Sequence, residues 1–518
     1  MTDILATSWC PYCLQTKPGA TSATLSLGDA IEDALDAEIQ RTENLISSLI
    51  LKRTRLYRKR NEIRAPIYSL PTEILTLIFK FACPPLDFPR KYGLDSRDPG
   101  KVAYPHILSV LTTVSARWHN LILSTPSLWT SFVADDRDIK AMKTLFSRAG
   151  SLPVSASLYF PTEWAPNDRH AAVLAPILKD HASQIYMLHV YMPSPTWLKE
   201  HIPDFVNLDY LFLRSGRREG KSFLIESSCT RLVMTDYSRC FSLSWSKIEV
   251  LHLEHTPDDF CLELLQKCTH LIEYRARCTW ALDEEETRPQ LPSSPFVLPR
   301  LKLFEWNLSL EGDAECAMLQ YTRLPALQTL VLVNESFRAS DMTSLPLVSA
   351  FFERLPPTLS AVEIRGFAFH PESQSSIFSY FLNLPNIESL TVRKCSGDFA
   401  DHVFSILGSK ICIVGNQGMP VFPKLKSIHI DSSDGGLDQA KILQTFRRSC
   451  SQPSELLLGS PFRIEITRHK MNWMPEFKEE LVRMVEKGYR LELWDNSKPV
   501  DWLPRTVKLS QGAVRQME

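Results

Sequence analysis

The chain has 518 residues, of which 44% are hydrophobic, so it is long enough for several domains or for one extended repeat array. Its formal net charge is -1, which excludes a global electrostatic attraction to nucleic acid or to membranes. The cysteines are scattered and the sequence holds no run of about 18 uncharged apolar residues, so we expect free thiols, no membrane partner, and an intracellular location in the cytoplasm or nucleus.

Residues 1–24 are polar and irregular, and we expect a flexible tail. Residues 25–65 contain no proline, with acidic residues concentrated in the first half and basic residues in the second, which complements a helix macrodipole. A heptad passes through Ile31, Leu35, Leu45, Leu49, Leu56 and Ile63, but Glu38, Thr42, Lys52 and Lys59 also fall on it. We predict a long charged helix that is a possible coiled coil.

Two further helices are expected between residues 66 and 132. The first begins at Leu70-Pro71, where the proline suits a first helical turn, and it continues through an apolar stripe to Ala82. Residues 86–103 read as an exposed loop. A second apolar stripe at helical spacing extends from Ile107 to Ile122 and stops before Pro126.

Four short motifs in this region occur in a specific order. They are Leu70-Pro71-Thr72-Glu73-Ile74-Leu75, Ile78-Phe79, Val114-Ser115-Ala116-Arg117-Trp118, and Leu123-Ser124-Thr125-Pro126-Ser127-Leu128-Trp129. Together they resemble an F-box, in particular the F-box-like module of the expanded family of mushroom-forming fungi. The resemblance covers about residues 25–132. The loop at 83–105 is longer than the compact form needs, and Ser115 stands where relatives often have cysteine.

The resemblance implies binding to the Skp1 adaptor and, through it, to a cullin in a ubiquitin ligase. The residues it implies for adaptor binding are Leu70, Pro71, Ile74, Leu75, Ile78 and Phe79. Those expected to build the core of the module are Val114, Trp118, Leu128 and Trp129. The alternative is that the two helices are simply core helices of a larger α-helical domain.

After residue 180, ten segments share one spacing: an apolar residue, two of any kind, an apolar residue, one of any kind, and an apolar residue. Clear examples are Leu327/Leu330/Leu332, Ile387/Leu390/Val392 and Leu425/Ile428/Ile430. A repeat of this kind cannot bury its apolar face alone and must stack on its neighbours. We therefore predict an irregular leucine-rich-repeat solenoid at residues 133–450, an arrangement that commonly follows an F-box. The pattern fades after about residue 450, so residues 451–518 are predicted to be a C-terminal cap and tail.

Side chains between the apolar positions of each repeat are expected to share the other face of the strands. Mixed aromatic and charged residues on such a face are able to recognise an unknown protein target, although an ordinary solvated face is the alternative. The candidates for this target-binding face are Tyr191, Tyr210, Arg214, His252, Arg275, Arg277, Arg365 and Arg393.

Enzymatic signals are weak. Trp9-Cys10-Pro11-Tyr12-Cys13 matches the redox motif of glutaredoxins, but too few residues precede it for the usual leading strand. No nucleotide-binding or zinc-protease motif occurs, and we predict no cofactor and no metal site. The basic run from Lys52 to Arg64 reads as a solvated helix face rather than a nucleic-acid site.

The sequence thus predicts an α/β protein with a long N-terminal helix, a helical F-box module and a repeat solenoid. We expect a non-enzymatic substrate-recognition subunit of a Skp1–cullin–F-box ubiquitin ligase. Two alternatives stay open. One is a leucine-rich-repeat scaffold without a role in ubiquitin transfer, and the other is an oxidoreductase that uses Cys10 and Cys13.

Overall fold

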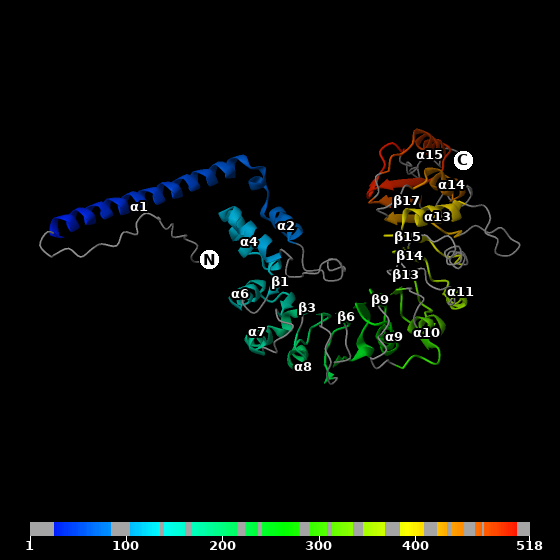
Figure 1. The fold of residues 1–518 in the computed structure, drawn as a ribbon. Coiled ribbons are helices and arrows are strands. Elements are labelled where there is room, and N and C mark those ends of the chain that lie inside the picture. The colour runs from blue at the N-terminus through cyan, green and yellow to red at the C-terminus, as the bar shows by residue number, and fades with distance from the viewer. Residues whose placement is uncertain are drawn as a thin grey trace, which may run out of the picture. The chain divides into compact units, whose positions relative to one another are not determined.

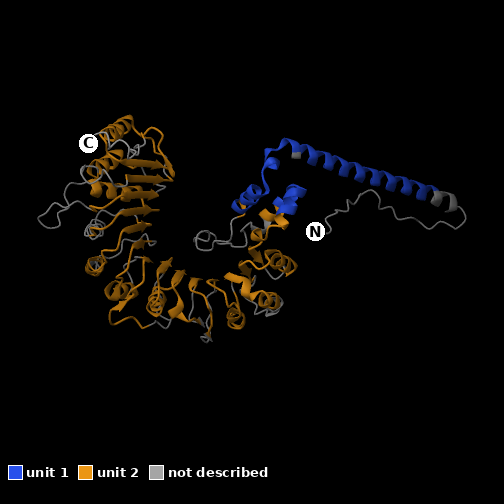
Figure 2. Cartoon of the chain, turned by 180° about the vertical axis from the view of Figure 1, so that it is seen from behind, with its two compact units in different colours: residues 1–81, 111–121 blue, residues 82–110, 122–518 orange. Residues whose placement is uncertain are grey.

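The structure is a computed structural model. It describes residues 25–83, 104–134, 139–160, 168–191, 193–214, 223–236, 241–279, 290–307, 313–334, 345–367, 384–408, 422–431, 437–449, 461–468 and 471–504. The chain forms two compact units (Figure 2). Unit 1 holds residues 1–81 and 111–121, and unit 2 holds residues 82–110 and 122–518.

Helices make up the described part of unit 1. Helix α1 (Leu25–Arg64) is a single helix of 40 residues, with the bounds that the proline-free segment predicts (Figure 1). Pro66 ends it and opens the 3₁₀ turn η1 (Pro66–Ser69), and α2 (Thr72–Ala82) follows with Glu73 in its first turn. An acidic side chain there is stabilised by the positive end of the helix dipole.

The second predicted helix is divided into two at Ser115. Helix α4 (Tyr104–Val114) precedes this residue and α5 (Ala116–Leu123) follows it. The Ser115 hydroxyl accepts a hydrogen bond from the backbone N–H of Trp118 at 3.2 Å, as an N-cap residue does. The apolar spacing of this stretch therefore indicated helix correctly but could not show the break. The expected loop at 86–103 lies outside the described residues.

A 15-stranded sheet forms most of unit 2, and its spatial order follows the chain. The 13 pairings between neighbouring strands from β1 to β18 are parallel. The pairing of β18 with β19 is antiparallel. The strands of this sheet are β1 (Ser131–Ala134), β2 (Val154–Tyr159), β3 (Ile185–Tyr191), β4 (Tyr210–Arg214), β6 (Arg231–Thr235), β8 (Val250–Glu254), β9 (Glu273–Arg277), β11 (Leu303–Asn307), β13 (Thr329–Val333), β14 (Ala361–Arg365), β15 (Ser389–Arg393), β16 (Ser427–Asp431), β17 (Phe462–Thr467), β18 (Leu491–Asp495) and β19 (Lys498–Pro499). Two small parallel pairs form separate sheets, β5 (Phe223–Leu224) with β7 (Phe241–Ser242) and β10 (Phe296–Val297) with β12 (Thr322–Arg323).

Helices lie along one face of this sheet (Figures 1 and 2). They are α6 (Ile139–Ala149), α7 (Asp168–Asp180), α8 (Pro195–His201), α9 (Asp258–Lys267), α10 (Asp313–Tyr321), α11 (Leu345–Glu353), α13 (Gly397–Gly408), α14 (Gln439–Ser449) and α15 (Pro475–Glu486). Parallel strands need such crossover connections, because a tight hairpin can join only antiparallel neighbours.

The apolar residues of the repeating pattern are aligned from strand to strand. The middle apolar residue of each segment faces its counterpart on the next strand, and all of them are buried: Leu188, Leu211, Leu232, Leu251, Tyr274, Phe304, Leu330, Val362, Leu390 and Ile428. In the middle of this row the rings of Tyr274, Phe304 and Trp306 stack on one another. The core of unit 2 is therefore a continuous band between the sheet and its helices.

The strand ends repeat one backbone feature. In the part of the chain that the structure describes, seven strands are followed immediately by a residue with positive φ, namely Asp236, His255, Cys278, Gly366, Lys394, Arg468 and Asn496. At Gly366 a Cβ would lie 2.5 Å from the carbonyl oxygen of Asn334, so this turn requires glycine. The same sharp exit thus recurs along the sheet.

The sheet extends further than the sequence pattern predicted. Strands β1 and β2 precede the first predicted repeat, and β17 and β18 continue the sheet beyond residue 450. In β17 the residues Phe462, Ile464 and Ile466 alternate with polar ones and point into the core, although Pro461 stands at the first position of the pattern. The expected end of the pattern near residue 450 was therefore placed too early.

Candidate functional site

Helix α2 has a buried face and an exposed apolar face. Leu75 and Phe79 have no exposed surface, and the Phe79 ring packs edge-on against Trp118 of α5 with a centroid distance of 4.8 Å. The neighbouring stripe is open to solvent and consists of Ile74, Leu77, Ile78 and Phe81, which are 43%, 49%, 38% and 77% exposed. These four positions follow the spacing of one helical face. We call them the α2 apolar face.

The turn before α2 is fixed by Arg117 of α5. Its guanidinium donates hydrogen bonds to the backbone carbonyl oxygens of Tyr68 and Leu70, the latter at 2.8 Å. These carbonyls flank the end of η1, where backbone acceptors lack helical partners. Arg117 therefore holds the Leu70-Pro71 turn, and with it the first turn of α2, against α5.

The structure changes the roles expected for several residues of this region. Leu75 and Phe79, expected to bind an adaptor, are buried in the core, because they lie about 100° around the helix from the exposed stripe. Val114, expected in the core, is 51% exposed. Leu77 and Phe81 belong to the exposed face and were missed; their spacing places them on one face with Ile74 and Ile78, but the sequence does not show that this face is the exposed one.

The remaining residues predicted for this region have the following surroundings. Leu70 is half-buried, Pro71 is exposed, and Trp118 is half-buried against Phe79. In unit 2, Leu128 and Trp129 are both buried just before β1. The Trp129 indole N–H donates to the carbonyl oxygen of Ile122 at 2.8 Å, which fixes the ring.

A cluster of charges lies on the sheet face opposite the core positions, around Glu305 of β11. The Glu305 side chain is fully buried, and its carboxylate accepts hydrogen bonds from Arg277 at 2.5 and 3.1 Å, from Arg275 at 3.0 Å and from Arg365 at 2.8 Å. Burial alone would raise the pKa of Glu305, but the hydrogen bonds and charge of Arg277, with Arg365 and Arg275, bring the pKa below its ordinary value. Glu305 is therefore ionised and ties three strands together.

The same charge pattern continues on both sides of Glu305. Glu273 accepts from His252 at 2.9 Å and from Arg275 at 2.6 Å. The hydrogen bond from His252 is the main cause that lowers the pKa of Glu273 to about 2. On the other side, Glu363 contacts Arg365 at 2.7 Å and Arg393 at 3.3 Å. We call this row from β8 to β15 the charge ladder.

Earlier strands present a different surface on the same face. Tyr191 stacks on Tyr159 at 4.5 Å between ring centroids, and the guanidinium of Arg214 lies 5.0 Å from the Tyr191 centroid. Tyr210 is only 3% exposed and packs with Phe212 and Val233. Tyr210, expected on the target-binding face, is therefore part of a small apolar cluster instead.

The structure thus gathers most of the predicted target-binding residues into two groups. Arg275, Arg277, Arg365 and Arg393 join His252 in the charge ladder, while Tyr191 and Arg214 form the aromatic group. The carboxylates that hold the arginines, above all Glu305, were not predicted as key residues. Their signal was an acidic residue beside a buried strand position, which is common on solvated strands as well.

The described residues contain no group of three His, Cys, Asp or Glu side chains that could hold a metal ion. Burial raises the pKa of Cys229 to about 11 and those of Cys268 and Cys395 to about 12, so these three thiols are unsuited to nucleophilic chemistry. Cys10 and Cys13 lie outside the described residues. Within the described part of the chain, no helix is both long and apolar enough to cross a membrane.

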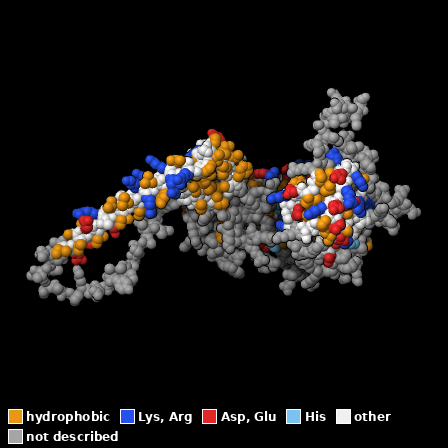
Figure 3. Space-filling view, turned by 90° about the horizontal axis from the view of Figure 1, so that it is seen from above, with side chains coloured by type: hydrophobic (Ala, Val, Ile, Leu, Met, Phe, Trp, Pro, Cys, Tyr) orange, Lys and Arg blue, Asp and Glu red, His pale blue; other side chains and the backbone are white. Residues whose placement is uncertain are grey.

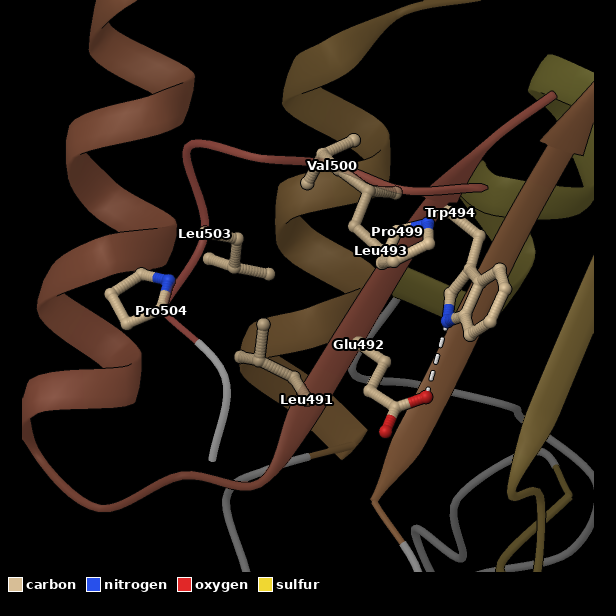
Figure 4. Close-up of a pocket in the computed structure, with 8 residues that line it drawn as sticks. All are labelled: Leu491, Glu492, Leu493, Trp494, Pro499, Val500, Leu503 and Pro504. Carbon is tan, nitrogen blue, oxygen red and sulfur yellow. Dashed lines mark hydrogen bonds between the residues drawn. The ribbon is translucent and has the colours of Figure 1, made fainter. Parts of the chain in front are cut away.

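A pocket of about 440 Å³ lies at the last strands of the sheet (Figure 4). Its lining is mainly apolar and comes from Leu491, Glu492, Leu493, Trp494, Pro499, Val500, Leu503 and Pro504. The one carboxylate, that of Glu492, accepts a hydrogen bond from the Trp494 indole at 3.1 Å. No paired acid and base stand in this lining, so its residues offer a small apolar surface and no catalytic arrangement.

Comparisons with known proteins identify no family. No protein-family model matches the sequence, and no curated protein matches it. Among solved structures, a protein of Bacteroides fragilis that was a structural genomics target is similar over 71% of this chain and 84% of its own, with 12% sequence identity and a TM-score of 0.28. A score this low carries no argument about function or about the details of the fold.

Proposed function

We propose that this chain is the substrate-recognition subunit of a Skp1–cullin–F-box ubiquitin ligase. In this proposal α2 and its neighbours bind the Skp1 adaptor, and through it a cullin, while the sheet of unit 2 acts as an irregular leucine-rich-repeat solenoid that binds a protein target. The protein catalyses no reaction, because partner subunits transfer the ubiquitin. The observation that carries the proposal is the α2 apolar face.

The α2 apolar face has the properties of a docking surface. Its four large side chains lie in one row on a helix only 11 residues long, and Phe81 alone is 77% exposed. Fully burying an exposed side chain of this size is worth about 1.5–3 kcal/mol, and Ile74, Leu77 and Ile78, which are already about half covered, would contribute roughly half of that each. The face is also rigid, since Leu75 and Phe79 anchor its back and Arg117 holds its first turn. A rigid, exposed apolar row of this kind favours binding to another protein.

The sheet supports the second half of the proposal. Its strands follow the chain order, each aligned with the next, and the apolar positions of the repeating motif form the buried band. Stacked repeats of this type cover one sheet face with their helices and leave the opposite face uncovered by them. In this chain that face carries the charge ladder and the aromatic group of Tyr191 and Arg214, which offer polar and aromatic contacts to a target.

The proposal is tested by binding of the purified full chain to a purified Skp1 adaptor. We expect wild type to form a complex, and the double variant Ile74→Asp, Phe81→Asp to bind at least about 30-fold more weakly, because two carboxylates would have to enter the interface. Val206→Asp is the matched control, since Val206 is an exposed apolar residue of unit 2 at 64% exposure and should bind like wild type.

Two results would overturn the proposal. If a folded wild-type chain does not bind the adaptor, the repeat scaffold without a role in ubiquitin transfer becomes the better account. If the α2 variant binds as tightly as wild type and the Val206 control, the docking surface lies elsewhere.

A further inference from the structure

Helix α1 has an apolar face that the described chain leaves uncovered. It is 40 residues long, about 60 Å, and every described side chain from Ile31 to Asn61 is exposed. Large apolar side chains occur along its whole length (Figure 3): Ile31, Leu35, Ile39, Leu45, Ile46, Leu49, Ile50, Leu51, Leu56, Tyr57 and Ile63 are between 49% and 85% exposed. Because helices gain most of their stability by packing an amphipathic face, a face of this extent calls for a partner.

The charges of α1 are divided along its length. The first half carries Glu32, Asp33, Asp36, Glu38 and Glu43, with Arg41 as its basic exception. The second half carries Lys52, Arg53, Arg55, Arg58, Lys59, Arg60 and Arg64, with Glu62 as its acidic exception. Between Glu43 and Lys52 no residue is charged, and this central segment holds Leu45, Ile46, Leu49, Ile50 and Leu51.

This division decides which pairing of two α1 helices is favourable. A parallel pair in register would place the acidic halves side by side and the basic halves side by side, and like charges repel. An antiparallel pair would place each acidic half along a basic half, with the uncharged apolar segments crossing at the centre. Charge complementarity therefore selects a second copy of this chain, in the opposite direction, as the partner.

The heptad positions agree with the antiparallel arrangement. In an antiparallel coiled coil, an a position of one helix faces a d position of the other, where a and d are the two apolar positions of the heptad. Setting Leu45 of one copy against Leu49 of the other brings Ile31 opposite Ile63 at both ends without any shift of register. The polar seam residues then meet favourable neighbours, since Glu38 lies one layer, about 4.5 Å along the axis, from Lys59 of the second copy.

We propose that two copies of this chain form a homodimer through an antiparallel coiled coil of their α1 helices, centred on Leu45 and Leu49. The dimer would place the C-terminal ends of the two α1 helices, which α2 follows in each chain, at opposite ends of the coiled coil. The two Arg64 residues would then lie about 50 Å apart. This inference does not depend on the proposed function, because it rests on α1 alone.

The first test is the mass of the purified full chain by light scattering after size exclusion. Wild type should have twice the chain mass of 59.1 kDa, and the variant Leu45→Asp, Leu49→Asp should be monomeric. The control Asn44→Asp, Ser47→Asp adds the same charge to the same segment on the side away from the seam, and it should stay dimeric. A monomeric wild type, including one that instead binds vesicles of anionic lipid through the basic half of α1, would overturn the proposal.

The second test reports direction and does not depend on the apolar variants. Glu38→Lys should raise the dimer dissociation constant about tenfold, because the new lysine lies near Lys59 of the other copy at both ends, and adding Lys59→Glu should restore it. A parallel dimer would show no such rescue, since Glu38 would face Glu38. Added salt should weaken the antiparallel dimer, and a dimer that strengthens with salt would contradict this arrangement.

Discussion

At the scale of single residues, the most consequential group is the buried carboxylate of Glu305. Three arginines from β9 and β14 converge on it, and it has no exposed side-chain surface. A buried charge of this kind costs desolvation, which is offset only while its partners remain. Such a residue is not recognisable from the sequence, because a glutamate between Phe304 and Trp306 also fits a solvated strand position. Only the alignment of β9, β11 and β14 brings its arginines together.

Replacing Glu305 by glutamine should therefore destabilise the protein strongly. The change leaves Arg275, Arg277 and Arg365 without their shared counter-ion, and we expect a loss of about 3–5 kcal/mol in the free energy of unfolding, measured by urea denaturation. Glu388→Gln is the matched control, because Glu388 pairs with Lys426 at the surface, with 43% of its side chain exposed, and its loss should cost under about 1 kcal/mol. Equal effects of the two changes would show that the cluster contributes no special stability.

Glu273 predicts a pH dependence. Its pKa falls from the ordinary value of 4.5 to about 2, mainly through the hydrogen bond from His252 and then through Arg275. A lowered carboxyl pKa stabilises the folded state above pH 4.5, and this contribution is lost as the pH falls through about 2. Wild type should thus exceed Glu273→Gln in urea midpoint at neutral pH, and the difference should shrink between pH 4.5 and pH 2. A difference that does not change with pH would contradict this role of the carboxylate.

At the scale of elements, the spacing of apolar residues predicted the strands better than the helices. Ten strands of the sheet contain the repeated pattern, because two apolar residues separated by one position must point into the same core. Helix α1 was predicted with its bounds, since proline marks its end and nothing interrupts it. The phase of α2 was not predicted, because its apolar residues cover most of its circumference and only the packing against Trp118 shows which of them are buried.

The two faces of one strand should respond differently to substitution. Leu390 of β15 is 2% exposed and lies between Val362 and Ile428 in the buried band. Leu390→Ala should lower the free energy of unfolding by about 2–5 kcal/mol, whereas Thr391→Ala, on the other face of the same strand, should cost under about 1 kcal/mol. Urea denaturation of both variants gives the comparison. Similar losses would mean that the band is not the core of this unit.

At the scale of the whole molecule, the order of parts was readable from the sequence: a long helix, a helical hairpin, and then a repeating α/β region with a parallel sheet. The extent of the sheet was not, since prolines (Pro153 and Pro461) stand at the first position of the pattern before β2 and β17, and the spacing Trp129/Phe132/Ala134 at β1 was not recognised. A partner cannot be read from a fold, because the same scaffold serves many proteins. In the proposed function, the α2 apolar face is the feature that connects this fold to adaptor binding.

The most direct measurement of the central claim is a calorimetric titration of the full chain with a purified Skp1 adaptor. The account predicts a one-to-one complex with a dissociation constant of about 1 µM or tighter, with the α2 apolar face as part of the interface. It also predicts that the heat disappears with Ile74→Asp, Phe81→Asp and persists with Val206→Asp. A folded wild-type chain that shows no binding at about 100 µM, a concentration at which even a weak specific complex forms, would contradict it.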